Sequence, residues 1–308
     1  MSAPRRVKLP INGVLLLDKP YDVSSNGALQ KARWLYSAAK AGHTGVLDPL
    51  ATGLLPVCFG EATKFSSYLL DADKGYRATV KFGQVTTTGD IEGEVVIERP
   101  VTFDRAALEQ TLAAFRGVIT QVPPMYSALK FQGRPLYEYA REGIEIERAG
   151  REVSIHRIEL LSFDGVDTAV IEVLCSKGTY IRTLAQDVGE RLGCGAHLTG
   201  LRRTTTGGFR LEDAHTLEAI EALPREARDG LLLPVDILVS HFPEQTLAAE
   251  DARRFCHGQA VRGAQNCATM QRFRVYQAQT REFLGLADAS EDGLLQPVRV
   301  MVAPATAL

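Results

Sequence analysis

Two long stretches in which apolar and polar residues alternate, 151–163 and 168–175, place the strongest limit on how this chain can fold. A period of two puts successive side chains on opposite faces of a sheet, so both stretches are predicted to be strands. Strand-like and helical patterns mix along the chain without a strict β-α-β rhythm. The predicted class is therefore α+β, a mixed and mainly antiparallel sheet flanked by helices. Further strands are expected at 13–17, 54–59, 74–83 and 196–206, and helices at 61–70, after Asp104 to about 115, and at 179–192.

The overall composition is that of an ordinary globular protein, with 308 residues, 45% of them hydrophobic and 23% charged. The net charge of −2 gives no overall nucleic-acid signature, so any RNA contact must come from local basic patches. The five cysteines are odd in number and form no Cys-x-x-Cys pair, which argues against a zinc site or a disulfide framework. This cysteine pattern fits a reducing, cytoplasmic location.

No apolar run reaches the length of a membrane span, and the basic start of the chain leads into no apolar segment typical of a signal peptide. The stretch at about 240–246 is predicted to join two units. The expected division is a large unit at 1–245 and a small one at 246–308. The small unit should contain a helix at 248–256 and strands near 269–276, 281–287 and 294–301.

The glycine-rich loop at 41–55 presents a single carboxylate, Asp48, which is followed by a proline. The proline biases Asp48 toward an extended or turn conformation. A lone carboxylate can act as a nucleophile, a base or a metal ligand, whereas Asp-Pro is also a common start of a simple turn. The residues of the loop leave these alternatives open. Three glycines allow tight bends or close approach of a ligand: Gly42, Gly45 and Gly53.

The stretch Gly42-His-Thr-Gly-x-Leu-Asp-Pro-x-Ala-Thr-Gly-x-Leu resembles the active-site loop of the TruB family of tRNA pseudouridine synthases. Four more stretches resemble motifs of that family in the same order, and together they cover about residues 10 to 210. The C-terminal unit is similar to the PUA domain that often closes such chains. The four further stretches are 17–25, 74–77, 123–139 within an RNA-contacting insertion at about 121–150, and 176–203.

The resemblance implies a cofactor-independent and metal-independent isomerase that converts the uridine at position 55, in the T-loop of tRNA, to pseudouridine. Asp48 would be the nucleophile, attacking C1′ of the ribose or C6 of the uracil, or trapping the sugar after the base departs. Arg182 would pair with Asp48 and keep it ionised in a pocket with little water. Tyr76 would stack on the target base and could relay a proton. Asp48 could instead make a simple turn, Arg182 could be a solvated helix charge, and Tyr76 could be an ordinary strand aromatic.

Other positions would hold the flipped uridine or support the loop. Tyr180 and Leu201 would line the pocket, although core packing alone would explain Leu201. His43 would fill space near the extruded nucleotide without acid–base work. Lys19 and Pro20 would buttress the loop of Asp48. One departure from the family pattern is Asp22, which replaces a glycine after the Lys-Pro motif and tolerates a left-handed conformation better than most residues.

The expected partner is tRNA, bound through its T-arm and, weakly, through its acceptor end by the C-terminal unit. A monomer is expected because no coiled-coil heptad is present. The alternative is an RNA-binding protein that helps tRNA fold, with catalysis incidental. A metal-dependent hydrolase lacks the companion acids and histidines. Candidate contacts to the RNA backbone, each of which could be a plain surface charge, are Lys130, Arg134, Arg141, Arg202 and Arg203.

Overall fold

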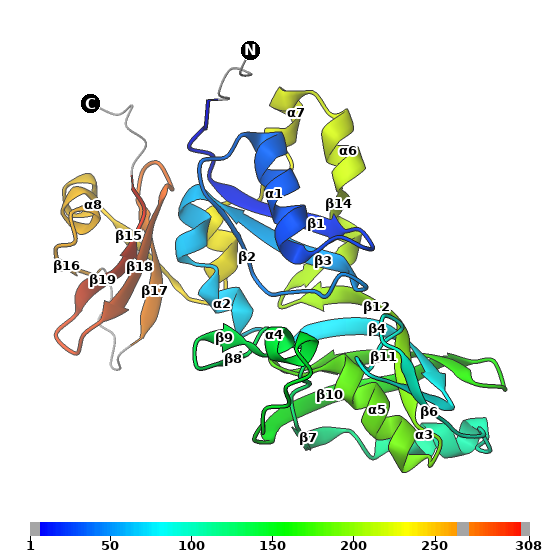
Figure 1. The fold of residues 1–308 in the computed structure, drawn as a ribbon. Coiled ribbons are helices and arrows are strands. Elements are labelled where there is room, and N and C mark those ends of the chain that lie inside the picture. The colour runs from blue at the N-terminus through cyan, green and yellow to red at the C-terminus, as the bar shows by residue number, and fades with distance from the viewer. Residues whose placement is uncertain (1–6, 264–270, 303–308) are drawn as a thin grey trace.

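One mixed sheet dominates the large N-terminal unit (Figure 1), and its topology confirms the predicted α+β class. The computed structural model describes residues 7–263 and 271–302. The sheet contains β1 (Gly13–Lys19), β2 (Ala41–His43), β3 (Thr52–Phe59), β4 (Lys74–Phe82), β7 (Gly117–Gln121), β10 (Arg151–Phe163), β11 (Thr168–Cys175), β12 (Ala196–Thr206), β13 (Phe209–Arg210) and β14 (His215–Thr216). Its hydrogen-bonded order is β14-β1-β3-β12-β4-β11-β10-β7, with β2 beside β3 and β13 beside β12. Among these described strands, the β1–β14 and β3–β12 pairs are parallel and the others antiparallel.

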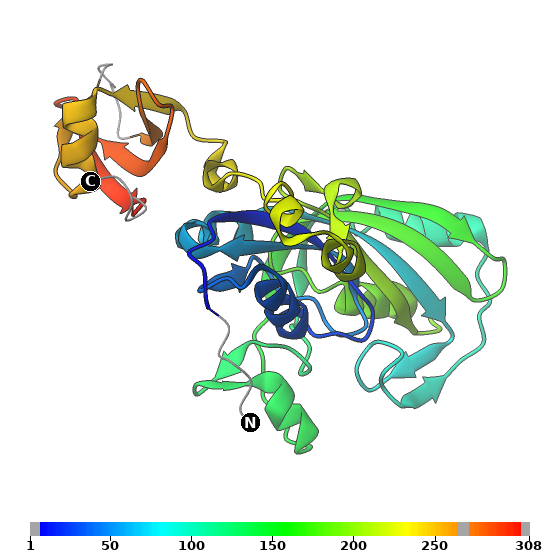
Figure 2. The ribbon, with the colours of Figure 1, turned by 90° about the horizontal axis from the view of Figure 1, so that it is seen from above.

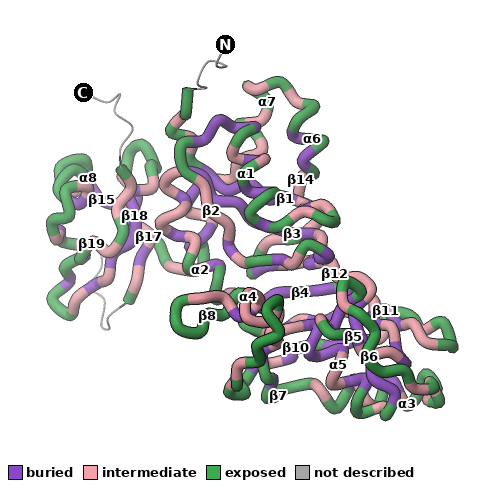
Figure 3. The backbone as a smooth tube through the Cα atoms, in the orientation of Figure 1, coloured by how far each residue is buried: buried purple, intermediate pink, exposed green. Residues whose placement is uncertain are grey.

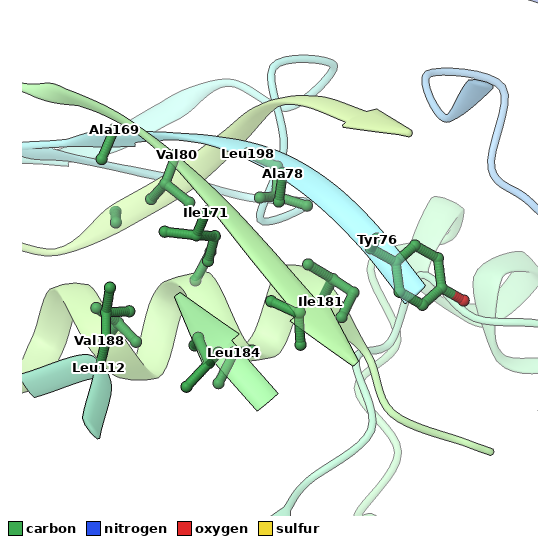
Figure 4. Packing of buried hydrophobic residues seen from close by; sticks show 14 of the residues in the cluster. Tyr76, Ala78, Val80, Leu112, Ala169, Ile171, Ile181, Leu184, Val188 and Leu198 are labelled. Carbon is green, nitrogen blue, oxygen red and sulfur yellow. The ribbon is translucent and has the colours of Figure 1, made fainter. Parts of the chain in front are cut away.

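The main core lies between this sheet and two helices, α3 (Arg105–Ala113) and α5 (Ile181–Arg191). The strands β10 and β11 have the predicted bounds, and β11 buries alternate residues as its sequence pattern requires. Asp104 caps α3 by accepting a hydrogen bond from the N–H of Ala107, at 2.9 Å. Figure 4 shows apolar side chains of β4, β11 and α5 in contact. Figure 3 shows the backbone buried along β3 and β4.

A second core lies where α1 (Ser25–Tyr36) and α6 (Leu217–Ala222) cover β1 and β3. Ser24 caps α1 by accepting a hydrogen bond from the N–H of Gly27, at 3.0 Å. The helix ends at Ser37, whose φ of 51° is left-handed. The cap at Ser24 and the packing of the helix on β1 and β3 fix where α1 begins beside the sheet. Other short helices of the large unit include α7 (Arg225–Asp229) and the 3₁₀ segments η2 (Leu211–Asp213) and η3 (Val235–Val239).

The helix predicted at 61–70 is wrong as a single element. The structure has a 3₁₀ segment, η1 (Gly60–Lys64), and then one α-helical turn, α2 (Ser67–Leu70). The Thr63 hydroxyl donates to the carbonyl of Gly60, at 2.7 Å, and the Ser66 hydroxyl donates to the carbonyl of Thr63, at 3.0 Å. These side chains compete for the carbonyls that a continuous helix would use, and the chain turns between the two pieces.

Two hairpins extend from the sheet region. One pairs β5 (Gln84–Thr86) with β6 (Val95–Glu98). The other, formed by β8 (Lys130–Phe131) and β9 (Arg134–Pro135), is followed by α4 (Leu136–Arg141). Figure 2 shows that this second hairpin and α4 stand out from the main sheet. They lie within the expected insertion.

The C-terminal unit has its own five-stranded sheet in the order β15-β17-β18-β19-β16, with the helix α8 against it. Its elements are β15 (Glu244–Leu247), α8 (Ala249–Cys256), β16 (Val261–Arg262), β17 (Arg272–Gln277), β18 (Phe283–Ala289) and β19 (Leu294–Val300). The strand β15 spans the expected boundary at 245–246. The first residues of the strand predicted near 269–276, residues 269 and 270, lie outside the described residues.

The two units share one apolar cluster. Leu286 on β18 is fully buried among residues of the large unit, including Phe65 and Val239. Beside the cluster, the Arg272 guanidinium donates to the hydroxyl of Tyr68, at 2.7 Å. The C-terminal unit is therefore docked on the large unit through a buried apolar contact with a hydrogen bond beside it.

Leu286→Ala should loosen this docking. Removing a buried leucine side chain costs about 2–5 kcal/mol in lost apolar transfer and cavity formation. Leu294→Ala is the matched control, because Leu294 belongs to the same unit but is 36% exposed, and surface changes usually stay within about 0.5 kcal/mol. Urea unfolding followed by circular dichroism measures both. Equal effects of the two substitutions would contradict the packing described here.

Candidate active site

The loop that carries Asp48 is anchored on both sides of that residue. Leu47 and Ala51 are buried in the main core together with Tyr76. The Ser25 hydroxyl accepts a hydrogen bond from the N–H of Leu47, at 2.7 Å, and donates one to its carbonyl, at 2.9 Å. The loop backbone is thereby tied to the core and to α1, while the carboxylate of Asp48 keeps 41% of its surface exposed. Such an arrangement presents one acid from a rigid backbone.

A buried ammonium group supports the loop from below. Lys19 at the end of β1 donates to the carbonyls of Pro20, at 2.9 Å, of Val23, and of Pro49, at 3.2 Å. Burial lowers the pKa of Lys19 to about 8, although the nearby Asp48 opposes that shift. These bonds join the turn after β1 to the residue that follows Asp48.

The unusual residue of that turn, Asp22, adopts the left-handed conformation that the sequence argument allowed. Its φ is 59°, and its N–H donates to the carbonyl of Pro49, at 3.1 Å. Aspartate at this position therefore forms a left-handed turn that is hydrogen-bonded to the loop of Asp48.

Arg182, in the first turn of α5, lies at the meeting point of three segments. Its Nη2 is 3.0 Å from Oδ2 of Asp48, and its Nη1 is 3.5 Å from Oδ2 of Asp90. Nη1 also donates to the carbonyl of Thr88, at 2.9 Å, and Nη2 donates to that of Tyr126, at 2.6 Å. The guanidinium thus connects the loop of Asp48, the hairpin that contains Asp90, and the insertion.

The charges around Asp48 act on its pKa in opposite directions. Burial raises the pKa, and the negative charge of Asp90 raises it further. The guanidinium of Arg182 lowers it through charge and a hydrogen bond, and the ammonium of Lys19 lowers it as well. Burial is the largest of these effects, so the pKa of Asp48 lies above its ordinary value.

Asp90 was missed by the sequence analysis. It is 2% exposed, and its Oδ1 accepts hydrogen bonds from the Thr88 hydroxyl, at 2.5 Å, and from the N–H of Glu92, at 3.1 Å. The sequence Thr-Thr-Gly-Asp around it is typical of a turn, in which aspartate commonly caps its own backbone. That local signal gives no indication that the second carboxylate oxygen lies near a guanidinium from a distant helix.

Tyr76 lies on β4 at the end of the main core and is 8% exposed. Figure 4 shows its hydroxyl pointing away from the apolar side chains. The phenol interacts electrostatically with Asp48 and with Arg203. Leu201 on β12 is opposite Ala78 and packs, partly buried, against the same core.

Tyr180 immediately precedes α5, so it is adjacent in the chain to the helix that carries Arg182. Its N–H donates to Oε1 of Gln121, at 3.0 Å, and its carbonyl accepts from Nε2, at 3.2 Å. The guanidinium of Arg151 lies 5.0 Å from its ring centre. These contacts fix the position of the ring beside the start of α5.

His43 is the last residue of β2, and its Nδ1 is buried without a hydrogen-bond partner among the described residues. Burial lowers the pKa of His43, and the positive charge of Arg203 lowers it further. The ring is therefore held in its neutral form.

The predicted RNA-backbone residues fall into different environments. Lys130 and Arg141 are exposed in the insertion. Arg134 pairs with Glu138, at 2.8 Å, and with Glu142. Arg202 forms two hydrogen bonds to the carboxylate of Asp18, at 2.6 and 3.1 Å, and keeps 41% of its side chain exposed.

The prediction that Arg203 contacts RNA phosphate is wrong. Its side chain is among the largest fully buried ones, with 1% of the residue exposed. Its Nε donates to the carbonyl of Leu54, at 2.7 Å, inside the protein. Arg202 and Arg203 are neighbours on one strand, so their side chains point to opposite faces of the sheet, and only one of them can reach solvent.

The described residues contain no cluster of three or more His, Cys, Asp or Glu side chains that could hold a metal ion. Within residues 7–263 and 271–302, no helix is long and apolar enough to cross a membrane. The site as it stands offers one accessible carboxylate, a buried guanidinium paired with it, and a phenol that interacts electrostatically with that carboxylate. This combination suits nucleophilic chemistry with proton transfer.

Comparison with known proteins agrees with this chemistry. Residues 33–181 match the TruB family pseudouridylate synthase N-terminal domain. Residues 182–240 match the tRNA pseudouridylate synthase B C-terminal domain, and residues 243–301 match the C-terminal domain of pseudouridine synthase II TruB. The tRNA pseudouridine synthase B of Chromobacterium violaceum is 67% identical over 307 residues, which covers 100% of both chains. The chain belongs to the TruB family.

Other relatives extend this result. The tRNA pseudouridine synthase B of Methylobacillus flagellatus is 54% identical over 297 residues, covering 96% of this chain and 97% of that protein. A chain in the crystal structure of a Cbf5–Nop10–Gar1 complex is 26% identical, with a TM-score of 0.68, and the match covers 95% of this chain and 84% of that one. As a TruB family member, the protein is a pseudouridine synthase with a small, β-rich, PUA-like C-terminal unit.

Two substitutions should shift the pKa of Asp48 in opposite directions. Asp90→Asn removes a negative neighbour and should lower that pKa, whereas Arg182→Gln removes the paired cation and should raise it. NMR of the side-chain carboxyl carbons during a pH titration measures both shifts. Asp164→Asn is the control, because Asp164 lies in an exposed loop and should leave the pKa of Asp48 unchanged. Shifts of the same sign in the first two variants would contradict the charge arrangement described above.

Proposed function

We propose that this TruB family enzyme acts on tRNA and converts the uridine at position 55 of the T-loop to pseudouridine. Asp48 is the nucleophile in this proposal. The observation that carries it is the geometry of Asp48, a carboxylate on an anchored loop 3.0 Å from the buried guanidinium of Arg182. That cation lowers the pKa of Asp48 against the larger effect of burial, and the reaction needs the ionised carboxylate.

The reaction breaks the bond between N1 of uracil and C1′ of ribose, turns the base and rejoins it through C5. Asp48 can take part by attacking C1′, by attacking C6 of the ring, or by trapping the sugar after the base departs. Each route needs a carboxylate held in one place against the substrate. The buried neighbours Leu47 and Ala51 support that requirement.

In this proposal the target uridine leaves the stacked T-loop and enters the site. Tyr76 stacks on the base and relays a proton, and Tyr180 and Leu201 hold the ring in place. His43, neutral and partly buried, fills space next to the extruded nucleotide. Lys19 and Pro20 position the loop of Asp48.

The T-arm would contact the exposed cations of the insertion, Lys130 and Arg141. Arg134 and Arg202 already pair with carboxylates, so contact with phosphate would require an exchange of partners. We assign residues 1–245 to catalysis and residues 246–308 to weak binding of the acceptor end. The enzyme would act as a cytoplasmic monomer without metal or cofactor.

The deciding experiment uses an unmodified T-arm stem-loop with one uridine at position 55. Wild-type protein should form pseudouridine there in the presence of a chelator, and Asp48→Asn should lower the rate by at least about 10³-fold. Filter binding should show that both proteins still bind the stem-loop, because the substitution removes one charge and no RNA-backbone contact. Product is counted after nuclease digestion and chromatography.

A stem-loop with cytidine at the target position is the matched substrate control and should give no product. Wild-type protein that binds the stem-loop tightly but forms no pseudouridine would contradict the proposal and favour a protein that assists tRNA folding. Full activity of Asp48→Asn would contradict the role of Asp48 alone.

A further inference from the structure

Arg203 carries a buried positive charge without a carboxylate partner among the described residues. It is 1% exposed, and within the described part of the chain the phenol of Tyr76 favours its charged form, through electrostatic attraction and a side-chain hydrogen bond. The two residues are also paired across neighbouring strands, Arg203 on β12 opposite Tyr76 on β4. A buried charge without a counter-ion is costly, so this placement calls for a reason.

The guanidinium also reaches both sides of the loop of Asp48. Its Nε donates to the carbonyl of Leu54, at 2.7 Å, on the C-terminal side of Asp48, and its Nη2 donates to that of Gly45, at 3.5 Å, on the N-terminal side. Gly53 lies directly beside the Arg203 backbone, where an added Cβ would be 2.3 Å from the Arg203 carbonyl oxygen. One side chain therefore fixes the loop of Asp48 relative to the hydroxyl of Tyr76.

The charged groups nearby do not neutralise Arg203. Lys74 and His43 face it, and each has its pKa lowered by its positive charge. Lys19 is affected in the same way. Burial raises the pKa of Tyr76 above its ordinary value, and the Cys175 thiol and the Asp48 carboxylate raise it further, whereas Arg203 lowers it through its charge and a hydrogen bond. Arg203 thus opposes the effect of burial on Tyr76, and negative charge that develops on the Tyr76 oxygen would lie beside this guanidinium.

We propose that Arg203 is a positioning residue that fixes the Tyr76 hydroxyl and stabilises negative charge on its oxygen while Tyr76 accepts a proton from the base. This inference rests on the proposed function. After C5 has bonded to C1′, C5 still carries its hydrogen. The C5–H bond breaks, the proton passes to the Tyr76 oxygen, and the electron pair forms the C5–C6 double bond. The pair of the former N1–C6 double bond moves to N1, which takes a proton from solvent.

The phenol had given its own proton to solvent beforehand, so the step is balanced and needs no oxidant, reductant or second substrate. Arg203 contributes by keeping the deprotonated oxygen paired with a cation in a site shielded from water. Its influence should therefore depend on pH, whereas a purely structural role would not.

The test compares Arg203→Gln, which loses the charge, with Arg203→Lys, which keeps it. Single-turnover rates are measured on saturating T-arm stem-loop from pH 6 to pH 9. Arg203→Gln should be slower by about 10²-fold or more at neutral pH. The deficit should shrink as pH rises, because without the cation the phenol ionises only at higher pH. Arg203→Lys should be faster than the glutamine variant and keep the wild-type pH dependence.

Each variant is also combined with Tyr76→Phe. If Arg203 acts through the Tyr76 hydroxyl, substituting Arg203 in the Tyr76→Phe variant should slow the reaction by less than about threefold. The effect of the double substitution on the activation free energy should then be much smaller than the sum of the effects of the two single substitutions. Arg210→Gln, an exposed arginine on β13, is the control for general loss of charge. Should Arg203→Gln fail to fold, the cycle with Arg203→Lys decides the question.

A deficit that is equal at every pH and additive with Tyr76→Phe would overturn the role of Arg203 while wild-type enzyme still forms product. Absence of product with wild-type enzyme would overturn both this role and the proposed function. The two failures are therefore distinguishable in one set of assays.

Discussion

The buried guanidinium of Arg182 connects the separate segments of the active site through its ion pairs and hydrogen bonds. Its side chain is 6% exposed and lies between the carboxylates of Asp48 and Asp90, with the carbonyls of Thr88 and Tyr126 completing its hydrogen bonds. Breaking a buried ion pair from one side costs about 3–5 kcal/mol, because an uncompensated charge remains. The loop, the hairpin and the insertion must therefore all keep their places for α5 to pack. A residue proposed as the nucleophile is at the same time a structural partner.

Site residues could be predicted from the sequence where they lie within motifs that resemble those of the family. Asp48 and Arg182 lie in such motifs, and the structure brings them into contact. Asp90 could not be found, because its carboxylate becomes significant only when the hairpin folds back onto a helix that begins far along the chain. Arg203 was misplaced for a different reason. Two consecutive arginines suggested one basic surface, yet neighbours on a strand face opposite sides, and the interior side had to receive one of them.

For the fold as well, elements set by a local sequence pattern were predictable, whereas features that depend on side-chain hydrogen bonds or distant contacts were not. The bounds of β10 and β11 were predictable because a regular alternation over many residues has few alternatives. The segment at 61–70 was not, because the hydroxyls of Thr63 and Ser66 divert backbone carbonyls from a helix that apolar spacing alone would favour. The docking of Leu286 against the large unit was also beyond prediction, since apolar periodicity identifies a buried face and gives no indication of what covers it.

Two buried lysines near the site are held by backbone carbonyls, whereas Arg182 is paired with carboxylates. Lys19 is held by the carbonyls of Pro20, Val23 and Pro49, and Lys74 donates to those of Leu70, at 3.0 Å, and Ala72, at 2.6 Å. Carbonyl dipoles stabilise a cation without cancelling its charge, so a positive field remains around the loop of Asp48.

Carboxylate partners would have made these positions more stable and electrically neutral. Apolar residues of similar volume would also have avoided the desolvation cost, often at a gain of about 1–4 kcal/mol. The chain instead keeps these charges in a region that, in the proposed reaction, holds an ionised carboxylate and negative charge on a phenol and on the departing base. Apolar burial is concentrated elsewhere, for example around Leu286 at the contact between the two units, where it stabilises the fold without adding charge near the site.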